Sequence, residues 1–141
     1  MSEKYLTFTV DGRIYAVSIV NVREIMNNAA DITPVPEFPS YARGIIQLRG
    51  DVIPIVDLRR LFRLRESDQI CVIVLECEKS GELLGLACDS VSAVEDIEPE
   101  EIHAPPRLIR GADYIGGITK TDKGIILVIE PEHIVVTGQH I

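Results

Sequence analysis

The sequence predicts an all-β protein with two intertwined small five-stranded antiparallel β-barrels around a shared hydrophobic core and with short helices. Three observations lead to this prediction. Short runs rich in β-branched residues recur along the chain at the length of strands. Turn signals that contain glycine separate neighbouring runs into hairpins. The same order of runs and turns occurs twice, which indicates an internal repeat.

The first elements follow from hydrophobic periodicity. Alternation predicts a half-buried strand at Tyr5–Val10, and an Asp-Gly turn signal leads into a second strand at Ile14–Val17. Apolar residues at helical spacing predict a helix at Ser18–Met26, capped by its first residue and ended by Asn27-Asn28. A short strand is expected at Ile32–Val35, before a proline-rich extended connection.

The middle of the chain predicts a hairpin with an arginine at its tip. Its strands are expected at Gly44–Leu48 and Val52–Val56, on either side of Arg49-Gly50-Asp51. Gly50 can supply the positive φ that a tight reversal needs. Pro54 has no N–H, so it is expected at a sheet edge or at an unbonded ladder position.

The remaining elements complete the β pattern. Asp57 is expected to cap a short helix at Leu58–Phe62. Two further hairpins are expected, one at Ile70–Glu76 with Glu82–Cys88 and one at Tyr114–Thr119 with Ile125–Ile129. Between them, the segment Ser90–Ile97 has apolar residues at every third position.

The repeat can be followed residue by residue. Tyr41-x-x-Gly44 recurs as Tyr114-x-x-Gly117, an offset of 73 residues, and Val52–Asp57 matches Ile125–Glu130 at the same offset. The chemical match predicts two homologous halves, each supplying about five strands to one barrel, with an apolar seam between them.

The halves are expected at about residues 4–66 and 69–136 of a single domain that spans 1–141. They provide an internal control, because a residue that occurs in both halves is explained by the fold. In the alignment of the two halves, the tip Leu48-Arg49-Gly50-Asp51 corresponds to a different sequence, Thr121-Asp122-Lys123-Gly124. The fold therefore does not require Arg49.

Composition narrows the possible functions. No apolar run approaches the roughly 20 residues of a membrane span, and the first residues lack a signal peptide's apolar region, so a cytoplasmic protein is expected. The net charge of −8 argues against nucleic acid as the main partner. Cys71, Cys77 and Cys88 form no C-x-x-C pair, so buried free thiols are expected and no metal site.

The charges are unevenly distributed along the chain. Arginines gather in the middle and a later segment is acidic; the two groups are Arg43, Arg49, Arg59, Arg60, Arg63 and Arg65, and Glu95, Asp96, Glu98, Glu100 and Glu101. Such groups form either solvated faces or two complementary docking surfaces, and the sequence leaves both interpretations open.

Three blocks of the sequence resemble the CheW family of bacterial chemotaxis coupling proteins. They read FTVDGRIYAVSIVNVREI, VPEFPSYARGIIQLRGDVIPIVDLR, and LLGLACDSVSAVEDI followed by HAPP, and the resemblance covers roughly residues 4 to 136. It implies two small five-stranded barrels around a common core and no enzymatic activity or cofactor. It also implies a cytoplasmic adaptor that joins the tips of chemoreceptors to the histidine kinase CheA, whose regulatory domain has the same fold.

The resemblance implies specific receptor contacts. They are Val22 and Glu24 of the V-x-E-I motif and Arg49 of the L-R-G motif. Gly44, Gly50 and Asp57 are instead expected to serve the fold and the hairpin. Kinase contacts are expected in loops at the barrel ends, without assigned residues.

Structural explanations stand beside these functional ones. Val22 could be a core residue, Glu24 an ordinary solvated residue, and Arg49 a residue that keeps the hairpin tip soluble. The sequence also departs from the family, with Gln47 in place of the usual asparagine before L-R-G, and it ends soon after Val136, before the longer C-terminal helix of many members.

Other functions receive less support from the motifs. An adaptor of a non-motility chemosensory pathway is the alternative to motility signalling. A small-barrel module for a ligand or oligonucleotide lacks the expected basic and aromatic face, because aromatic residues make up only 5% of the chain. An enzyme lacks any catalytic constellation, and His103, His133 and His140 have no metal-ligand spacing.

Overall fold

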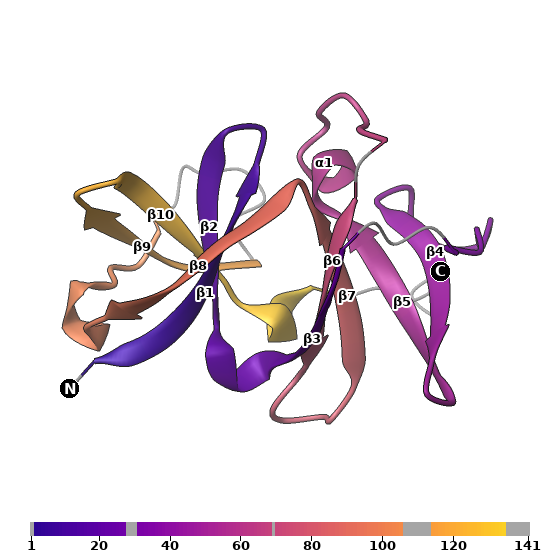
Figure 1. Cartoon of the computed structure of the whole chain (residues 1–141), viewed down its shortest axis with the longest axis horizontal. Helices are drawn as coiled ribbons and strands as arrows, with labels where there is room; N and C mark the ends of the chain where they lie inside the picture. The colour runs from indigo at the N-terminus through magenta and orange to yellow at the C-terminus, as the bar shows by residue number, and fades with distance from the viewer. Residues whose placement is uncertain (1, 28–30, 69, 106–113, 135–141) are drawn as a thin grey trace.

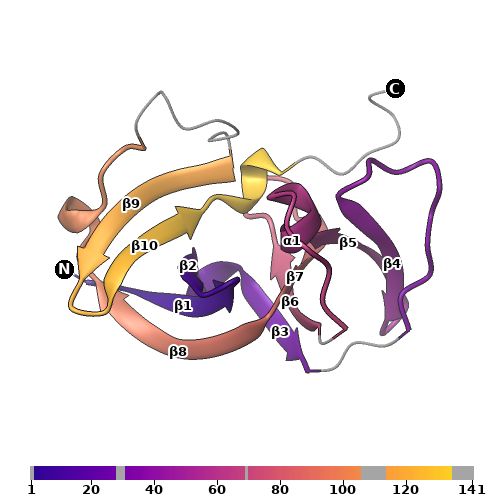
Figure 2. The same cartoon turned by 90° about the horizontal axis from the view of Figure 1, so that it is seen from above.

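The structure is a computed structural model that describes residues 2–27, 31–68, 70–105 and 114–134. Ten strands in these residues form two five-stranded sheets, which lie side by side in Figures 1 and 2. Sheet A has the order β8 (Ser90–Ile97), β1 (Glu3–Val10), β2 (Arg13–Ser18), β10 (Gly124–Ile129) and β9 (Ile115–Thr121). Sheet B has the order β3 (Val22–Met26), β6 (Cys71–Glu76), β7 (Leu83–Cys88), β5 (Asp51–Asp57) and β4 (Ala42–Leu48).

Short helical segments lie at the ends of strands. The one α-helix of the described residues, α1, spans Leu58–Leu61, one residue shorter than expected. The 3-10 segments are η1 (Ile19–Asn21), η2 (Pro99–Glu101) and η4 (Pro131–His133). No helix of the described residues is long and apolar enough to cross a membrane.

Both sheets are built from strands of both sequence halves. Sheet A combines β1 and β2 of the first half with β8, β9 and β10 of the second, and sheet B combines β3, β4 and β5 with β6 and β7. The predicted intertwined arrangement is therefore confirmed, but the expectation that each half supplies its strands to one barrel is wrong, because each half crosses to the other sheet after its second strand. This exchange also creates one parallel pair in each sheet, β2 with β10 and β7 with β5.

The backbone confirms the expected repeat. The Asp57 N–H donates to the Tyr41 carbonyl at 2.8 Å, and the Glu130 N–H donates to the Tyr114 carbonyl at 2.7 Å. The second bond is the counterpart of the first, because both of its residues lie 73 positions later in the chain. The two sheets also have the same order once each strand is replaced by its counterpart in the other half.

Glycine in the repeated Tyr-x-x-Gly motif is explained by a close crossing of the chain. A Cβ at Gly44 would lie 2.1 Å from the Thr33 carbonyl oxygen, and one at Gly117 would lie 2.2 Å from the Ile102 side chain. Neither position has room for a side chain, so both halves need glycine there.

The helix expected at Ser18–Met26 is wrong. Only η1 is helical, Ser18 makes no side-chain cap bond, and the next five residues form β3, which pairs with β6. The β-branched residues of this segment suit a pleated strand. A register shift between Val22 and Glu24 adds one residue to β3, which helps to explain why its apolar spacing resembled a helix. Asn28, expected to end the helix, lies outside the described residues.

Two smaller expectations also need correction, and a third is confirmed. The segment Ile32–Val35 contains only an isolated bridge from Thr33 to Ile45, not a strand. The strand β1 is covered on both faces rather than half-buried, because Thr7 is buried as well as Phe8. Pro54 lies in β5, an interior strand of sheet B, but pairing with β7 begins only at Ile55, so the expected unbonded ladder position is confirmed.

The hydrophobic core has a central part and two lateral parts. The central cluster contains buried residues of both sheets, including Phe8 and Tyr15 of sheet A and Ile73 and Leu86 of sheet B. One smaller cluster belongs to each sheet. The shared apolar seam expected from the sequence is therefore present, and Cys71, Cys77 and Cys88 are buried free thiols.

Candidate protein-interaction site

The tip of the β4–β5 hairpin holds Arg49 in an unusual conformation. Leu48 pairs with Asp51, which leaves a two-residue turn with φ of 51° at Arg49 and 87° at Gly50. Positive φ at both positions defines a type I′ turn, whose first position usually holds asparagine, aspartate or glycine. The Arg49 side chain extends into solvent from this turn and is 75% exposed.

The other two predicted contact residues lie on β3, an edge strand of sheet B. Val22 is half-buried against the central core cluster, and the Glu24 side chain is 27% exposed. The neighbouring residues Arg23 and Ile25 are more exposed than either. Val22 thus combines a core contact with partial exposure, and Glu24 is more than a solvated surface residue.

A side-chain contact joins the two places. Arg49 Nη1 donates a hydrogen bond to Glu24 Oε1 and forms an ion pair with it. The two residues come from β3 and from the β4–β5 hairpin, which carry opposite edges of sheet B. An ion pair this exposed contributes at most about 1 kcal/mol to folding. Most of the guanidinium of Arg49 remains available to a partner.

Exposed apolar side chains lie close to Glu24 and Arg49 in the sequence. The described residues contain five exposed large apolar side chains: Val20, Ile25, Val52, Val94 and Ile125. Val20 and Ile25 flank Val22 and Glu24, and Val52 follows the hairpin tip. Exposed apolar side chains around a charged residue are typical of protein interfaces. Val94 of β8 is the counterpart of Val22, because Ser18-Ile19-x-x-Val22 recurs as Ser90-Val91-x-x-Val94 at an offset of 72 residues.

Gly44, Gly50 and Asp57 lie at a close crossing of the chain, in the hairpin turn and at the start of α1, respectively. The Asp57 carboxylate is buried and accepts the Arg59 N–H at 2.9 Å, which caps α1. It also accepts a hydrogen bond from Arg43 Nη1 at 2.8 Å, so it fastens β4 to the start of α1. These contacts use both carboxylate oxygens within the fold.

A second charged cluster was not anticipated from the sequence. Arg59 donates two hydrogen bonds of 2.7 Å to Asp89, from Nε and Nη2, and Asp89 accepts the Asp11 N–H at 2.8 Å. The hydrogen bonds from Arg59 lower the pKa of Asp89 below its usual value. Asp11 belongs to the β1–β2 turn of sheet A and Arg59 to α1 after sheet B. The cluster therefore ties the two sheets together, and only the arginine-rich composition hinted at it.

Comparison with known proteins places this geometry in a family. The model of the CheW-like domain matches residues 4–138. The chain belongs to the CheW-like family. It is 31% identical over 134 residues to the chemotaxis protein CheW of Treponema pallidum, with 89% of this chain and 77% of the relative covered.

Other comparisons agree with this membership. The chain is 30% identical over 135 residues to the chemotaxis protein CheW of Bacillus subtilis, with 93% of this chain and 79% of the relative covered. The crystal structure of the scaffolding protein TtCheW from Thermoanaerobacter tengcongensis matches with a TM-score of 0.82 and 32% identity, over 92% of this chain and 89% of that one. The all-β, CheW-like fold predicted from the sequence is therefore confirmed, with two five-stranded sheets.

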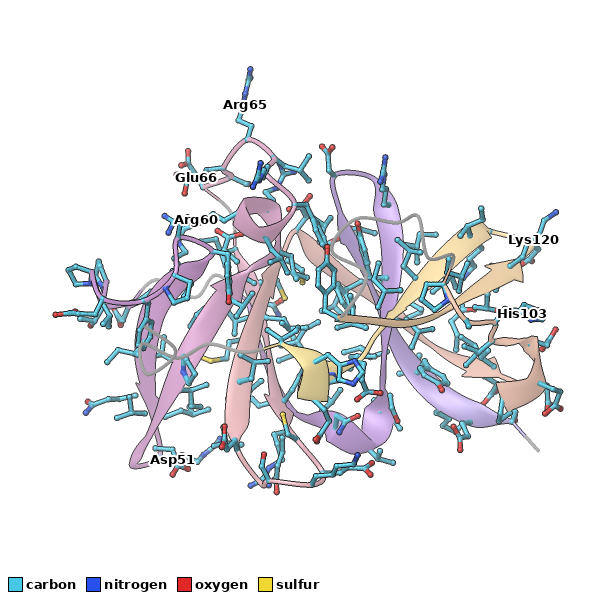
Figure 3. The ribbon with its side chains drawn as sticks, turned by 180° about the vertical axis from the view of Figure 1, so that it is seen from behind. Asp51, Arg60, Arg65, Glu66, His103 and Lys120 are labelled. Carbon is cyan, nitrogen blue, oxygen red and sulfur yellow. The ribbon has the colours of Figure 1, made fainter. Side chains whose placement is uncertain are left out.

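Part of the charge in this CheW-like chain is paired internally. Asp96 accepts a hydrogen bond from Lys4 at 2.9 Å, and Glu95 accepts one from Lys123 at 2.6 Å. Arg60 donates to Glu66 at 2.5 Å, and Figure 3 labels these two side chains in the same part of the molecule. Complementary docking surfaces remain a prediction.

The histidines do not gather into a site in the described residues. His103 pairs with Ile118 through an isolated bridge, His133 lies in η4, and His140 falls outside the described residues. In the described part of the chain no group of three or more histidine, cysteine, aspartate or glutamate side chains could hold a metal ion.

Proposed function

We propose that this CheW-like protein is a non-enzymatic scaffold that couples the cytoplasmic tips of chemoreceptors to the histidine kinase CheA in chemotaxis signalling. The observation that carries the proposal is the ion pair of Arg49 with Glu24, which joins the hairpin tip to the edge strand β3 and has exposed apolar residues close to it along the chain. The names of the relatives, which include chemotaxis and scaffolding proteins, support the same conclusion.

The receptor would bind across β3 and the hairpin tip. Val22 would supply part of an apolar contact, because its partly exposed side chain is fixed from behind by the central core. Arg49 suits such an interface because its stem packs on apolar surface while its planar group makes several hydrogen bonds. Glu24 would hold the guanidinium in place before the receptor arrives, which lowers the entropy cost of binding.

The kinase would bind elsewhere on the protein. A scaffold of this kind fixes the kinase relative to the receptor and performs no chemistry, so one receptor-binding surface and one surface for the CheA regulatory domain are required. Each contact would be modest by itself and would gain strength from many linked copies in a receptor array at the cytoplasmic face of the membrane.

A binding experiment tests the proposal. The full chain is immobilised and exposed separately to a receptor cytoplasmic fragment and to the CheA regulatory domain. We expect both to be retained, and a chain that already holds the kinase domain should still capture the receptor fragment. Retention of neither partner would refute the scaffold, and mutual exclusion would refute the two separate surfaces.

A further inference from the structure

A groove lies at the end of the molecule opposite the hairpin tip. It has a volume of about 600 Å³ and lies between the β1–β2 turn, the loop after α1, and the strands β9 and β10. Figure 1 shows the β1–β2 turn and α1 at the top of the view and the β4–β5 tip at the bottom, and Figure 3 places Arg65 and Asp51 at the same two ends. None of Val22, Glu24 and Arg49 lines the groove.

The groove has an aromatic lining that continues from the core. Phe8 stacks on Tyr15 with 5.9 Å between ring centroids, Tyr15 on Phe62 with 5.2 Å, and Phe62 contacts Tyr114 at 5.7 Å. Phe8 and Tyr15 are buried, while Phe62 and Tyr114 are partly exposed. Rings held in such a row are already ordered, so a ligand that contacts them loses little side-chain entropy.

Arg63, at the rim of the groove, has a backbone conformation that favours glycine. The Arg63 N–H donates to the Arg60 carbonyl at 3.0 Å and the Leu64 N–H to the Arg59 carbonyl at 2.7 Å, which is a Schellman motif at the end of α1. Glycine is the usual residue at the position that Arg63 occupies with φ of 59°.

A strained residue that persists at a surface often serves a ligand. The described residues contain three non-glycine residues with positive φ: Asp11, Arg49 and Arg63. Aspartate tolerates this conformation, whereas arginine gains nothing from it. Arg49 has an ion-pair partner within the chain, but the exposed Arg63 side chain pairs with no carboxylate of the described residues.

The charge of the groove differs from that of the whole protein. Arg13 and Arg63 line it together with one acidic residue, Asp11, whose carboxylate lies 3.9 Å from Arg59. The whole chain has a net charge of −8. We propose that this groove binds a short acidic peptide segment of a partner protein, whose large apolar side chain rests on Phe62 and Tyr114 and whose carboxylates meet Arg63 and Arg13. Tyrosine and arginine are among the residues that most often dominate such contacts, and phenylalanine is enriched at interfaces.

A peptide titration tests this inference on the full ¹⁵N-labelled chain. The probe is the synthetic peptide EEFLEE, and the comparison peptides are KKFLKK and EEAAEE. We expect EEFLEE to shift the amide signals of Phe62, Leu64 and Leu127 with saturation, and both comparison peptides to bind at least about tenfold more weakly. Absence of shifts with EEFLEE, or equal binding of KKFLKK, would overturn the inference.

Variants separate the ligand role of Arg63 from a structural one. Arg63→Gly should leave the urea midpoint unchanged or raise it, because it relieves the backbone, and should weaken EEFLEE binding by about tenfold. Arg63→Gln keeps the backbone conformation and should weaken binding to a similar extent. The matched control is Arg65→Gly, which removes the same charge from a side chain that points away from the molecule in Figure 3. Wild-type affinity in either Arg63 variant, or an equal loss in Arg65→Gly, would contradict the proposal.

Discussion

Two arginines, Arg49 and Arg63, occupy backbone conformations with positive φ, in which the Cβ atom lies too close to a backbone carbonyl oxygen. Each lies where glycine or a short polar residue would be less strained, the first in a type I′ turn and the second at the end of a helix. The sequence singled out Arg49 because its tip does not recur in the second half. It did not single out Arg63, because the predicted helix at Leu58–Phe62 places Arg63 after a helix end but does not show that the helix ends in a Schellman motif with positive φ at that residue.

Gly44 provides a test of the repeat at the residue scale. We expect Gly44→Ala to lower the free energy of unfolding by about 2–4 kcal/mol, because its new Cβ would lie 2.1 Å from a backbone oxygen and φ is 147°. Urea denaturation followed by circular dichroism measures the effect.

The matched control for Gly44 is Gly116→Ala. The nearest atom to its new Cβ is a side-chain carbon at 3.2 Å, so the loss should stay below about 1 kcal/mol. If Gly44→Ala is no less stable than this control, the close crossing does not constrain the chain.

Among the elements, the hairpins could be predicted from the sequence, whereas β3 was predicted as part of a helix. The pairs β4–β5, β6–β7 and β9–β10 follow from β-branched runs and turn residues that act locally. The segment of η1 and β3 has apolar residues at helical spacing, and only its pairing with β6, which lies about 50 residues later in the chain, selects a strand. The predicted contacts Val22 and Glu24 kept their place on one element although the type of that element was wrong.

The Arg59–Asp89 cluster links elements and predicts a dependence of stability on pH. The pKa of Asp89 is lower in the folded chain than in the unfolded one, so its stabilisation is complete above the unfolded pKa of about 4 and is lost as the pH falls through the folded pKa. Asp89→Asn should therefore cost about 1–3 kcal/mol at pH 7 and progressively less below pH 4.

Urea denaturation between pH 7 and pH 3 checks this dependence. The control is Asp122→Asn, which changes an exposed carboxylate in the β9–β10 turn and should have a small effect at every pH. A cost of Asp89→Asn that stays constant over the whole range would show that the carboxylate charge is not what stabilises the cluster.

The molecule as a whole has an intertwined topology that an internal repeat does not reveal by itself. Similar halves can form two separate barrels or exchange strands, and the local patterns are the same in both cases. The exchange observed here gives each sheet strands from both halves, so the two halves of the chain cannot come apart without unpairing β2 from β10 and β7 from β5. A scaffold that transmits position benefits from this arrangement, because its binding surfaces keep a fixed spacing.

The function proposed for the molecule depends most on Arg49. We expect Arg49→Glu to fold as the wild type does and to weaken binding of a receptor cytoplasmic fragment by about 2–4 kcal/mol, because it places a second carboxylate beside Glu24 and removes an interfacial arginine. Arg65→Glu, which makes the same charge change in the loop after α1, should bind the fragment as the wild type does. Calorimetric titration of the three proteins with the same fragment decides the matter: a selective loss in Arg49→Glu is predicted, and wild-type affinity in that folded variant would contradict the proposed receptor site.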